Sequence, residues 1–271
     1  MVITDLDGTL ASGGIVPETS TVLLKKLGEK AVLRTIATGR SLSGTEKVLG
    51  PDFPIDYLIF SSGAGVLHWP TREILQTHQL NRSDAQSILG VLSQHGLNFM
   101  LHHPIPNNHH FFFWEGENPQ EDFKRRVEKH KELGKPWGGE IPEVISQFLV
   151  VSSFVSSEGV WQGLKKALPQ FNVIRATSPL DGQSAWLEIF SKKVSKSLAA
   201  SWLTQSLQVD VREVLAIGND YNDHDLLSWA GTSYVVADAI PTLIDQFPKV
   251  KACAEGGFCE AVRLWEQRLQ D

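Results

Sequence analysis

Two aspartates separated by one residue carry the clearest chemical signal in the chain. Asp5 and Asp7 lie in the segment DLDGTL, directly after the short run 2–4, which we expect to be a strand. Side chains two positions apart in an extended chain point to the same side, so both carboxylates can face one reacting group. Gly8 allows a sharp turn that brings backbone N–H groups towards an anion. Because Asp and Gly are also common in turns, an acidic turn without chemistry is the alternative explanation.

Three further segments combine polar residues with the end of a strand or the start of a helix. The segment 38–40 (TGR) follows the expected strand 33–37, Lys196 begins a helical stretch, and the segment 218–223 (GNDYND) follows the run VLAI. Alone, each has an ordinary explanation, namely a turn, a solvated lysine, or Asx residues that cap a helix. Ligands of open α/β sheets bind at the carboxyl ends of strands, so four such segments in order favour one shared site.

The elements that must position these residues alternate between short β-branched runs and helical stretches, which is typical of an α/β fold. After about residue 80 the pattern changes to α+β, and the alternation resumes near residue 186. We therefore expect a Rossmann-like parallel-sheet core from residues 1–81 and 186–271, interrupted by a cap domain of residues 82–185. Strands are predicted at 2–4, 32–38, 56–61, 66–69, 98–103, 110–114, 144–155, 171–176, 186–190, 214–217 and 233–236, and helices at 17–30, 83–95, 120–133, 159–168, 196–206, 223–229 and the C-terminal end.

The four segments resemble, in order, the four motifs of the haloacid dehalogenase-like phosphatases. DLDGTL is similar to the first motif, TGR to the second, Lys196 in KKVSKSLAA to the lysine of the third, and GNDYND to the fourth, usually GDxxND. The length and position of the insertion resemble those of Cof-type members with a large α/β (type IIB) cap. The tail segments AGTSYVVADA and AEGGFCEAV also resemble that subfamily, so the resemblance covers the whole chain.

The resemblance implies phosphoryl transfer through an aspartyl-phosphate, in which Asp5 attacks phosphorus and Asp7 is the acid and base. Thr38 and Lys196 would hold the phosphoryl oxygens, because this reaction needs mainly positioning and charge neutralisation. Further expected contacts to phosphate or substrate are Gly8, Thr9, Gly39, Arg40, Ser62 and Asn222. A Mg²⁺ cofactor is implied, with the candidate ligands Asp5, Asp7 through its backbone carbonyl, Asn219, Asp220 and Asp223.

Two positions depart from the family's pattern. Asn219 stands where the first aspartate of the fourth motif is usual, and its amide oxygen can ligate a metal but carries no charge. Metal affinity should therefore fall unless Asp220 compensates, and Asp223 is expected as a ligand or as a partner of one. Ser62 replaces an Asn of many relatives and could still contact substrate. Arg40 could be a substrate contact or a structural surface residue.

The insertion has an unusual composition around its histidines. His102, His103 and the segment 107–114 (NNHHFFFW) put polar donors beside aromatic side chains. This region is expected either to help select the leaving group or to be a half-buried cap strand with alternating apolar residues. The histidine spacings match no familiar transition-metal site.

Charge and hydropathy restrict the partners. The formal charge is −6 and the longest basic run is 124–126, so no nucleic-acid partner is expected. No run approaches the roughly 20 apolar residues of a membrane span, and the first residues do not resemble a secretory signal. Cys253 and Cys259 fit no zinc or redox motif. We expect a cytoplasmic protein without a membrane partner.

Together these patterns predict a Mg²⁺-dependent phosphomonoester hydrolase for a small phosphorylated metabolite. A sugar phosphate is the expected substrate class, by analogy with the subfamily alone. A phosphomutase on the same scaffold is one alternative. A phosphate-binding module with impaired turnover is another, which Asn219 motivates and the presence of both Asp5 and Asp7 opposes.

Overall fold

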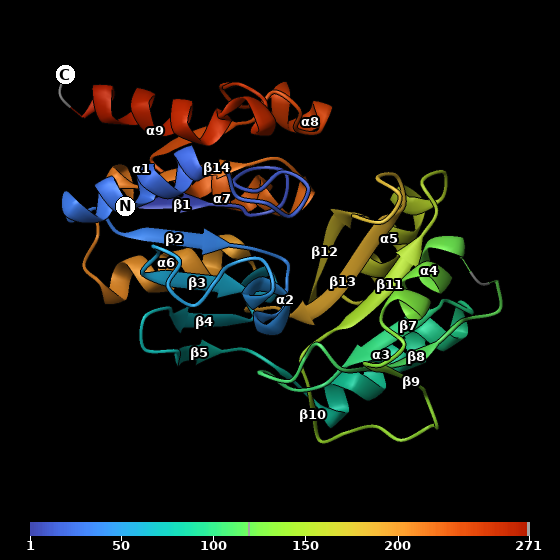
Figure 1. The fold of residues 1–271 in the computed structure, drawn as a ribbon. Coiled ribbons are helices and arrows are strands. Elements are labelled where there is room, and N and C mark those ends of the chain that lie inside the picture. The colour runs from blue at the N-terminus through green and yellow to red at the C-terminus, as the bar shows by residue number, and fades with distance from the viewer. Residues whose placement is uncertain (119, 270–271) are drawn as a thin grey trace. The chain divides into compact units, whose positions relative to one another are not determined.

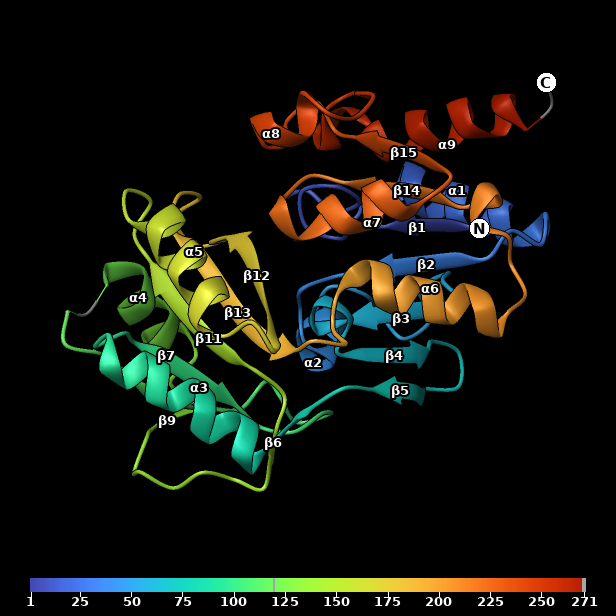
Figure 2. The same cartoon turned by 180° about the vertical axis from the view of Figure 1, so that it is seen from behind.

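The computed structural model describes residues 1–118 and 120–269, which form two compact units (Figures 1 and 2). The core unit comprises Met1–Gln76 and Ser195–Asp271, and the inserted unit comprises Thr77–Val194. The sequence-based boundary at residue 186 differs from this division, because the segment 186–190 lies in a strand of the inserted unit's sheet. Its apolar alternation predicts a strand, but the sheet that a strand joins depends on partners distant in sequence.

The core unit is built on a mostly parallel sheet in the order β15-β14-β1-β2-β3-β4-β5. Strands β15, β14, β1, β2 and β3 pair in parallel, and β4 runs antiparallel to β3. Residues of β1 and β14 are fully buried, as expected for a sheet that helices cover on both faces. The strands are β1 (Val2–Thr4), β2 (Arg34–Ala37), β3 (Tyr57–Phe60), β4 (Gly65–His68), β5 (Glu73–Thr77), β14 (Leu215–Gly218) and β15 (Thr232–Val235).

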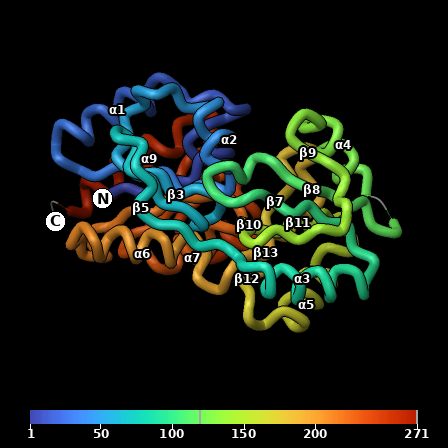
Figure 3. Tube along the Cα trace, turned by 90° about the horizontal axis from the view of Figure 1, so that it is seen from below, coloured from blue at the N-terminus to red at the C-terminus, as the bar shows by residue number. Residues whose placement is uncertain are grey.

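Helices lie on both faces of this sheet, with α1 and α9 on one side and α6 and α7 on the other (Figure 3). Apolar residues of these helices, such as Leu27 and Phe258, are buried against the strands. The predicted α/β class with a parallel core sheet is thus confirmed. The helices of the core unit are α1 (Glu18–Glu29), α2 (Leu42–Glu46), α6 (Lys196–Ser206), α7 (His224–Trp229), α8 (Pro241–Ile244) and α9 (Gly257–Arg268).

The inserted unit contains a mixed sheet in the order β12-β13-β11-β7-β8-β9 and a small antiparallel ribbon of β6 and β10. Strands β12, β13, β11, β7 and β8 pair antiparallel, and β9 joins β8 in parallel. The strands are β6 (Leu80–Asn81), β7 (Phe99–His102), β8 (Phe111–Trp114), β9 (Gly134–Pro136), β10 (Val144–Ile145), β11 (Phe148–Ser152), β12 (Phe171–Thr177) and β13 (Ala185–Ser191).

Three helices pack on the inserted unit's sheet. α3 (Arg82–Gln94) and α5 (Ser157–Ala167) cover one face, where they bury an apolar cluster, and α4 (Glu121–Lys129) contributes Phe123 to a second cluster with Met100 of β7. The predicted helix 120–133 is longer than α4, and β9 follows it after a short turn. No helix in the described part of the chain is long and apolar enough to cross a bilayer.

Candidate active site

The two N-terminal aspartates lie in a tight loop at the carboxyl end of β1. Gly8 has a φ of +78°, a conformation that favours glycine. A Cβ on Gly8 would approach the side-chain nitrogen of Asn219 to 2.5 Å, so the loop also needs glycine for space. The Thr9 hydroxyl donates to the Asn219 amide oxygen over 3.2 Å. These contacts join the first and fourth motifs, although they lie about two hundred residues apart.

Lys196 connects the same loop to a second carboxylate. Ser195 caps α6 by accepting the backbone N–H of Leu198, which fixes Lys196 as the first residue of the helix. The ammonium of Lys196 donates to Oδ1 of Asp5 and to Oδ1 of Asp223, over 2.6 Å in both cases. All three side chains are buried, with Lys196 only 1% exposed. Lys196 thus joins the first-motif loop to the fourth motif.

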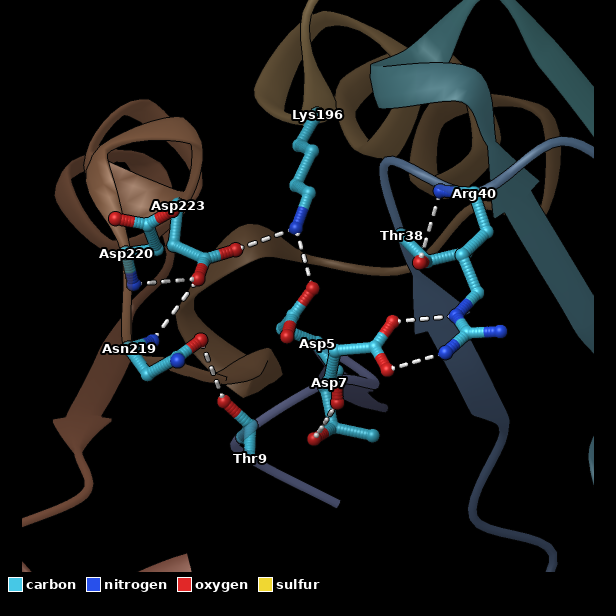
Figure 4. A network of polar contacts seen from close by, with 10 residues as sticks. Asp5, Asp7, Thr9, Thr38, Arg40, Lys196, Asn219, Asp220 and Asp223 are labelled. Atoms are coloured by element: carbon cyan, nitrogen blue, oxygen red, sulfur yellow. Dashed lines mark hydrogen bonds and ion pairs between the residues drawn. The ribbon is translucent and has the colours of Figure 1, made fainter. Parts of the chain in front are cut away.

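Asp223 is held from its other side by the backbone of its own loop. Its Oδ2 accepts the N–H of Asn219 over 2.9 Å and that of Asp220 over 3.1 Å. Asp220 caps the following turn, because its carboxylate accepts the N–H of Asp223. Figure 4 shows this carboxylate directed away from Asp5, whereas the Asn219 amide is directed towards Thr9. Asn219, not Asp220, thus faces the first-motif loop.

The buried cluster of Asp5, Asp223 and Lys196 has two carboxylates for one ammonium. Burial raises the pKa of Asp5, Lys196 lowers it and Asp223 raises it again, with a net upward shift. Burial alone would lower the pKa of Lys196, but the Asp223 and Asp5 carboxylates outweigh burial and raise it. The ammonium therefore stays charged, and the cluster carries one net negative charge when Asp5 is ionised.

Arg40 and Asp7 form a second, more exposed ion pair. The Arg40 Nε and Nη2 donate to the two Asp7 oxygens over 2.6 and 2.7 Å. The hydrogen bonds to Asp7 raise the pKa of Arg40. Arg40 was expected as a substrate contact or a surface residue, and in this structure it orients the carboxylate of Asp7. A third contact, from Nη1 to the carbonyl of Gly44, fixes the guanidinium further.

The second-motif turn lies beside a strained turn that follows β3. The hydroxyl of buried Thr38 accepts the N–H of Arg40 over 3.1 Å. A Cβ on Gly39 would lie 3.5 Å from both the Ser62 hydroxyl and the Asn222 amide, so these two side chains flank the turn. Ser62 has a φ of +56°, a costly conformation for a residue other than glycine.

All the residues that the sequence singles out for the site thus gather at one end of the core unit's sheet. Their contacts link the ends of β1, β2, β3 and β14 with the start of α6, as expected for ligand sites of open α/β sheets. The set comprises Asp5, Asp7, Gly8, Thr9, Thr38, Gly39, Arg40, Ser62, Lys196, Asn219, Asp220, Asn222 and Asp223.

Asp225 is a supporting residue that the sequence motifs did not indicate. Its Oδ2 accepts both the N–H and the hydroxyl of Ser197, over 3.0 and 2.5 Å. This anchors the first turn of α6, and hence Lys196, to α7. The signal in the sequence is weak, because a single Asp in a helix has many ordinary uses.

Oxygen donors at the site suit a hard divalent cation. Within the described residues, Oδ2 of Asp5 accepts no hydrogen bond, and it lies in a cluster with two carboxylates for one ammonium. No described group of three or more His, Cys, Asp or Glu side chains is arranged around a common metal position. Asn219 provides an amide where the family's pattern has a carboxylate. The carboxylate, amide and backbone carbonyl oxygens present nevertheless fit Mg²⁺.

Comparison with known proteins agrees with this geometry. The profile of the haloacid dehalogenase-like hydrolases matches residues 2–256. The chain belongs to this family. It is a phosphatase of the superfamily, and members of the family generally use Mg²⁺. The predicted Cof-type resemblance is confirmed.

Individual relatives cover nearly the whole chain. YxeH of Bacillus subtilis is 26% identical over 260 residues, which span 90% of each protein. The HMP-PP phosphatase of Cronobacter sakazakii is 24% identical over 258 residues, which span 90% of this chain and 86% of that enzyme. A solved subclass IIB sugar phosphatase covers 98% of each chain with a TM-score of 0.76 and 15% identity, which establishes a shared fold.

Proposed function

We propose that the chain is a Mg²⁺-dependent phosphomonoester hydrolase that uses Asp5 as its nucleophile. One observation carries this proposal: Asp5 is buried, its Oδ1 is held by Lys196, and its Oδ2 accepts no hydrogen bond from any described residue. A carboxylate held in this way is oriented and keeps an oxygen for attack. Family membership supports the same reaction class.

In the first half-reaction, Asp5 attacks phosphorus in line with the leaving oxygen. The bond from Asp5 to phosphorus forms as the bond from phosphorus to the leaving oxygen breaks, and Asp7, which must first take up a proton, gives it to the departing alkoxide. Lys196 and Thr38 hold the phosphoryl oxygens. Asp7 is positioned for its task by Arg40, whose two hydrogen bonds orient the carboxylate.

In the second half-reaction, water attacks phosphorus of the aspartyl-phosphate. Asp7 takes one proton of this water, inorganic phosphate leaves and the Asp5 carboxylate is restored. Bound Mg²⁺ would supply positive charge for the phosphoryl oxygens. Asp5, the carbonyl of Asp7 and the amide of Asn219 would hold it, while Asp220 serves as a cap and Asp223 as a partner of Lys196.

A generic aryl-phosphate assay tests the nucleophile. We expect Mg²⁺-dependent turnover in the wild type and its loss in Asp5→Asn, with a decrease of at least about 10³-fold. The exposed Asp245→Asn is the matched control and should retain the wild-type rate. Equal rates in wild type and Asp5→Asn would refute the assignment. Phosphate binding without any turnover would instead favour the binding module that Asn219 motivates.

For the substrate we propose a small phosphorylated metabolite, and within that class a sugar phosphate. The relatives support the broader class, since one is named an HMP-PP phosphatase, and a structural neighbour is named a sugar phosphatase. The inserted unit, residues 77–194, is our candidate for the part that selects the leaving group. A panel of phosphorylated metabolites tests the sugar preference, and product analysis separates hydrolysis from phosphomutase transfer.

In the histidine-rich region of the inserted unit, the first histidine, His102, has a packing role. His102 is buried, and its Nδ1–H donates to the carbonyl of Asn108 over 2.7 Å. His103 stacks on Phe112 with ring centroids 5.1 Å apart. These contacts favour the half-buried strand over substrate recognition for this segment.

A further inference from the structure

Helix α6 begins at Lys196, and a chain of hydrogen bonds surrounds this first turn. The Ser197 hydroxyl donates to Oδ2 of Asp225 over 2.5 Å, so its single hydrogen is used there. The hydroxyl oxygens of Ser195 and Ser197 lie 3.0 Å apart, and Ser195 is therefore the donor between them. The Ser195 oxygen in turn accepts the N–H of Leu198. The chain starts in the backbone of α6 and ends at the carboxylate of Asp225.

Asp225 also brings a negative charge to the amino end of α6. The same oxygen accepts the backbone N–H of Ser197 over 3.0 Å, which is one of the N–H groups without a partner inside the helix. The helix spans eleven residues, so its amino end favours an anion. The first turn of α6 has no acidic residue of its own, and the carboxylate from α7 takes this place.

The beginning of α7 thus holds Lys196 at both ends of its side chain. Asp223, directly before α7, accepts from the ammonium over 2.6 Å, whereas Asp225 accepts from the backbone one residue after Lys196. Figure 4 shows the lysine side chain extended from the start of α6 towards Asp5 and Asp223. A lysine side chain has many rotamers, so its ammonium is placed precisely only when its backbone is fixed as well.

The turn that follows β3 makes a further contact with the start of α6. Gly63 has a φ of +102°, and a Cβ there would lie 2.2 Å from the carbonyl oxygen of Ser195. This close approach requires glycine, and a larger residue would force the backbone apart. Of the contacts that fix the first turn of α6, the one from Asp225 can therefore be removed without such a clash.

We propose that Asp225 is a positioning residue for Lys196, because it fixes the first turn of α6 and so keeps the ammonium within reach of the transferring phosphoryl group. The inference rests on the proposed phosphatase reaction. The need is greatest in the aspartyl-phosphate, in which the Asp5 carboxylate has become an acyl phosphate without its full negative charge. Lys196 then retains Asp223 and the anchored backbone as its supports.

Steady-state turnover of an aryl phosphate measures the consequence. In Asp225→Ala we expect kcat to fall by about tenfold or more and KM to change by less than about threefold, because a misplaced ammonium costs most where charge develops on the phosphoryl oxygens. Asp225→Asn should recover most of the rate, since its amide oxygen can accept the same two hydrogen bonds. An Asn variant as slow as the Ala variant would show that the charge itself is needed and would overturn the positioning role.

Asp210→Ala is the matched control in the same unit. The Asp210 carboxylate accepts the backbone N–H of Arg212 over 2.9 Å, near the amino end of β14 and thus at the end opposite the candidate site. Its loss also deprives a backbone N–H of a carboxylate, so we expect a similar small decrease in Tm but an unchanged kcat. Equal kcat in Asp210→Ala and Asp225→Ala would leave Asp225 with a structural role alone and refute the proposal.

Ser197→Ala tests whether the two contacts of Asp225 form one anchor. The variant loses the hydroxyl contact and keeps the N–H contact, so we expect a decrease in kcat of only about two- to threefold. Because both contacts end on one oxygen of Asp225, the double variant should be no slower than Asp225→Ala. A double variant whose loss is the product of the two single losses would contradict the shared anchor.

NMR of the lysine ammonium groups follows Lys196 without turnover. An ammonium that is buried between two carboxylates should give its own ¹H–¹⁵N signal in protein made with ¹⁵N-labelled lysine, and Lys196→Met assigns that signal. We expect the signal to shift or broaden in Asp225→Ala, to return in Asp225→Asn and to stay unchanged in Asp210→Ala. An unchanged signal in Asp225→Ala would overturn the inference.

The two readouts separate this inference from the proposed function. An unchanged signal and kcat in Asp225→Ala, with loss of turnover in Asp5→Asn, would overturn the inference and leave the phosphatase mechanism intact. A wild type without turnover would refute the hydrolase, and the Lys196 signal in Asp225→Ala would still decide whether Asp225 positions the lysine.

Discussion

Lys196 in the core unit and Arg126 in the inserted unit bury positive charge in opposite ways. Lys196 donates to two carboxylates at 2.6 Å, and its pKa is raised. The half-buried Arg126 lies over the ring of Trp186 at 4.1 Å and donates to the sulfur of Met100. Burial lowers the pKa of Arg126 to about 10, although Glu188 and Asp122 act to raise it.

The difference separates the cation for which we propose a chemical role, Lys196, from one that packs against an aromatic ring, Arg126. Two buried carboxylates around Lys196 cost desolvation energy that a packing role would not require. A guanidinium on an aromatic ring fills space, and the buried carboxylates of Asp122 and Glu188 favour the charge of Arg126 without forming a close ion pair with it. The close ion pairs of Lys196 with two carboxylates therefore mark the candidate site of the core unit. Within the described residues, no equally close ion pair involves Arg126.

The strongest test of this contrast is Lys196→Met. The substitution leaves Asp5 and Asp223 buried without a cation, so we expect a loss of about 3–5 kcal/mol in the free energy of unfolding. Turnover should fall by about 10²–10³-fold or more, because the phosphoryl oxygens lose a positive partner. Urea unfolding and an aryl-phosphate assay measure the two effects. The exposed Lys193→Met should stay within about 0.5 kcal/mol of the wild type, and equal stability of both variants would contradict the role of the buried pair.

Acid should lower the stability of the inserted unit, because His102 is buried in its uncharged form. Burial, and next the charge of Arg126, lower the pKa of His102 from 6.5 to about 3, while its hydrogen bond to Asn108 acts in the opposite direction. The unfolded chain takes up a proton near pH 6.5 that the folded chain refuses, so stability falls as the pH falls below that value. The expected loss from this group is about 2 kcal/mol at pH 5.

His102→Gln should remove most of this pH dependence, because the amide can still donate to Asn108 and does not titrate. Unfolding free energies at pH 7 and pH 5, from urea titrations followed by circular dichroism, provide the measurement. The exposed His95→Gln is the control and should keep the wild-type difference between the two pH values. An unchanged pH difference in His102→Gln would refute the assignment.

The smallest effect is expected for Arg126→Met. This change removes the cation from the Trp186 ring, but the nearby buried carboxylates of Asp122 and Glu188 keep hydrogen bonds from Trp186 and Gln147, so the loss should be about 0.5–1 kcal/mol. It should also weaken the acid sensitivity of His102, because one of the charges that lower its pKa is gone. Arg125→Met, on the exposed side of the same helix, is the reference. A loss as large as that of Lys196→Met would remove the contrast between the two units.

The sequence was sufficient to predict the residues that meet at the candidate site, but not their mutual arrangement. Asp5, Lys196 and Asp223 could be found because each lies in a short motif at a strand end or helix start. The pairing of Arg40 with Asp7, over 33 positions in the chain, depends on how neighbouring strands bring their ends together. No local pattern contains that information.

Two other features show the same limit of local patterns. The motif GNDYND offered two candidates for a metal ligand, and only the turn after β14 shows that the Asn219 amide contacts Thr9 whereas Asp220 caps the turn. The run 186–190 predicts a strand, yet its antiparallel pairing with β11 and β12 decides that it belongs to the inserted unit. Both outcomes are set by contacts between distant segments, which the periodicity of one segment does not encode.

The order of the motifs along the chain also has a consequence for biosynthesis. Strand β1 carries Asp5 near the N-terminus, but one of its two neighbours in the sheet is β14, more than two hundred residues later. A ribosome therefore releases the whole inserted unit before the core sheet can close. Lys196 and Asp223 emerge in the last third of translation, so a chain that stops before residue 196 has Asp5 but neither Lys196, which holds its carboxylate, nor Asp223, which pairs with Lys196. We therefore expect chains truncated before residue 196 to lack phosphatase activity.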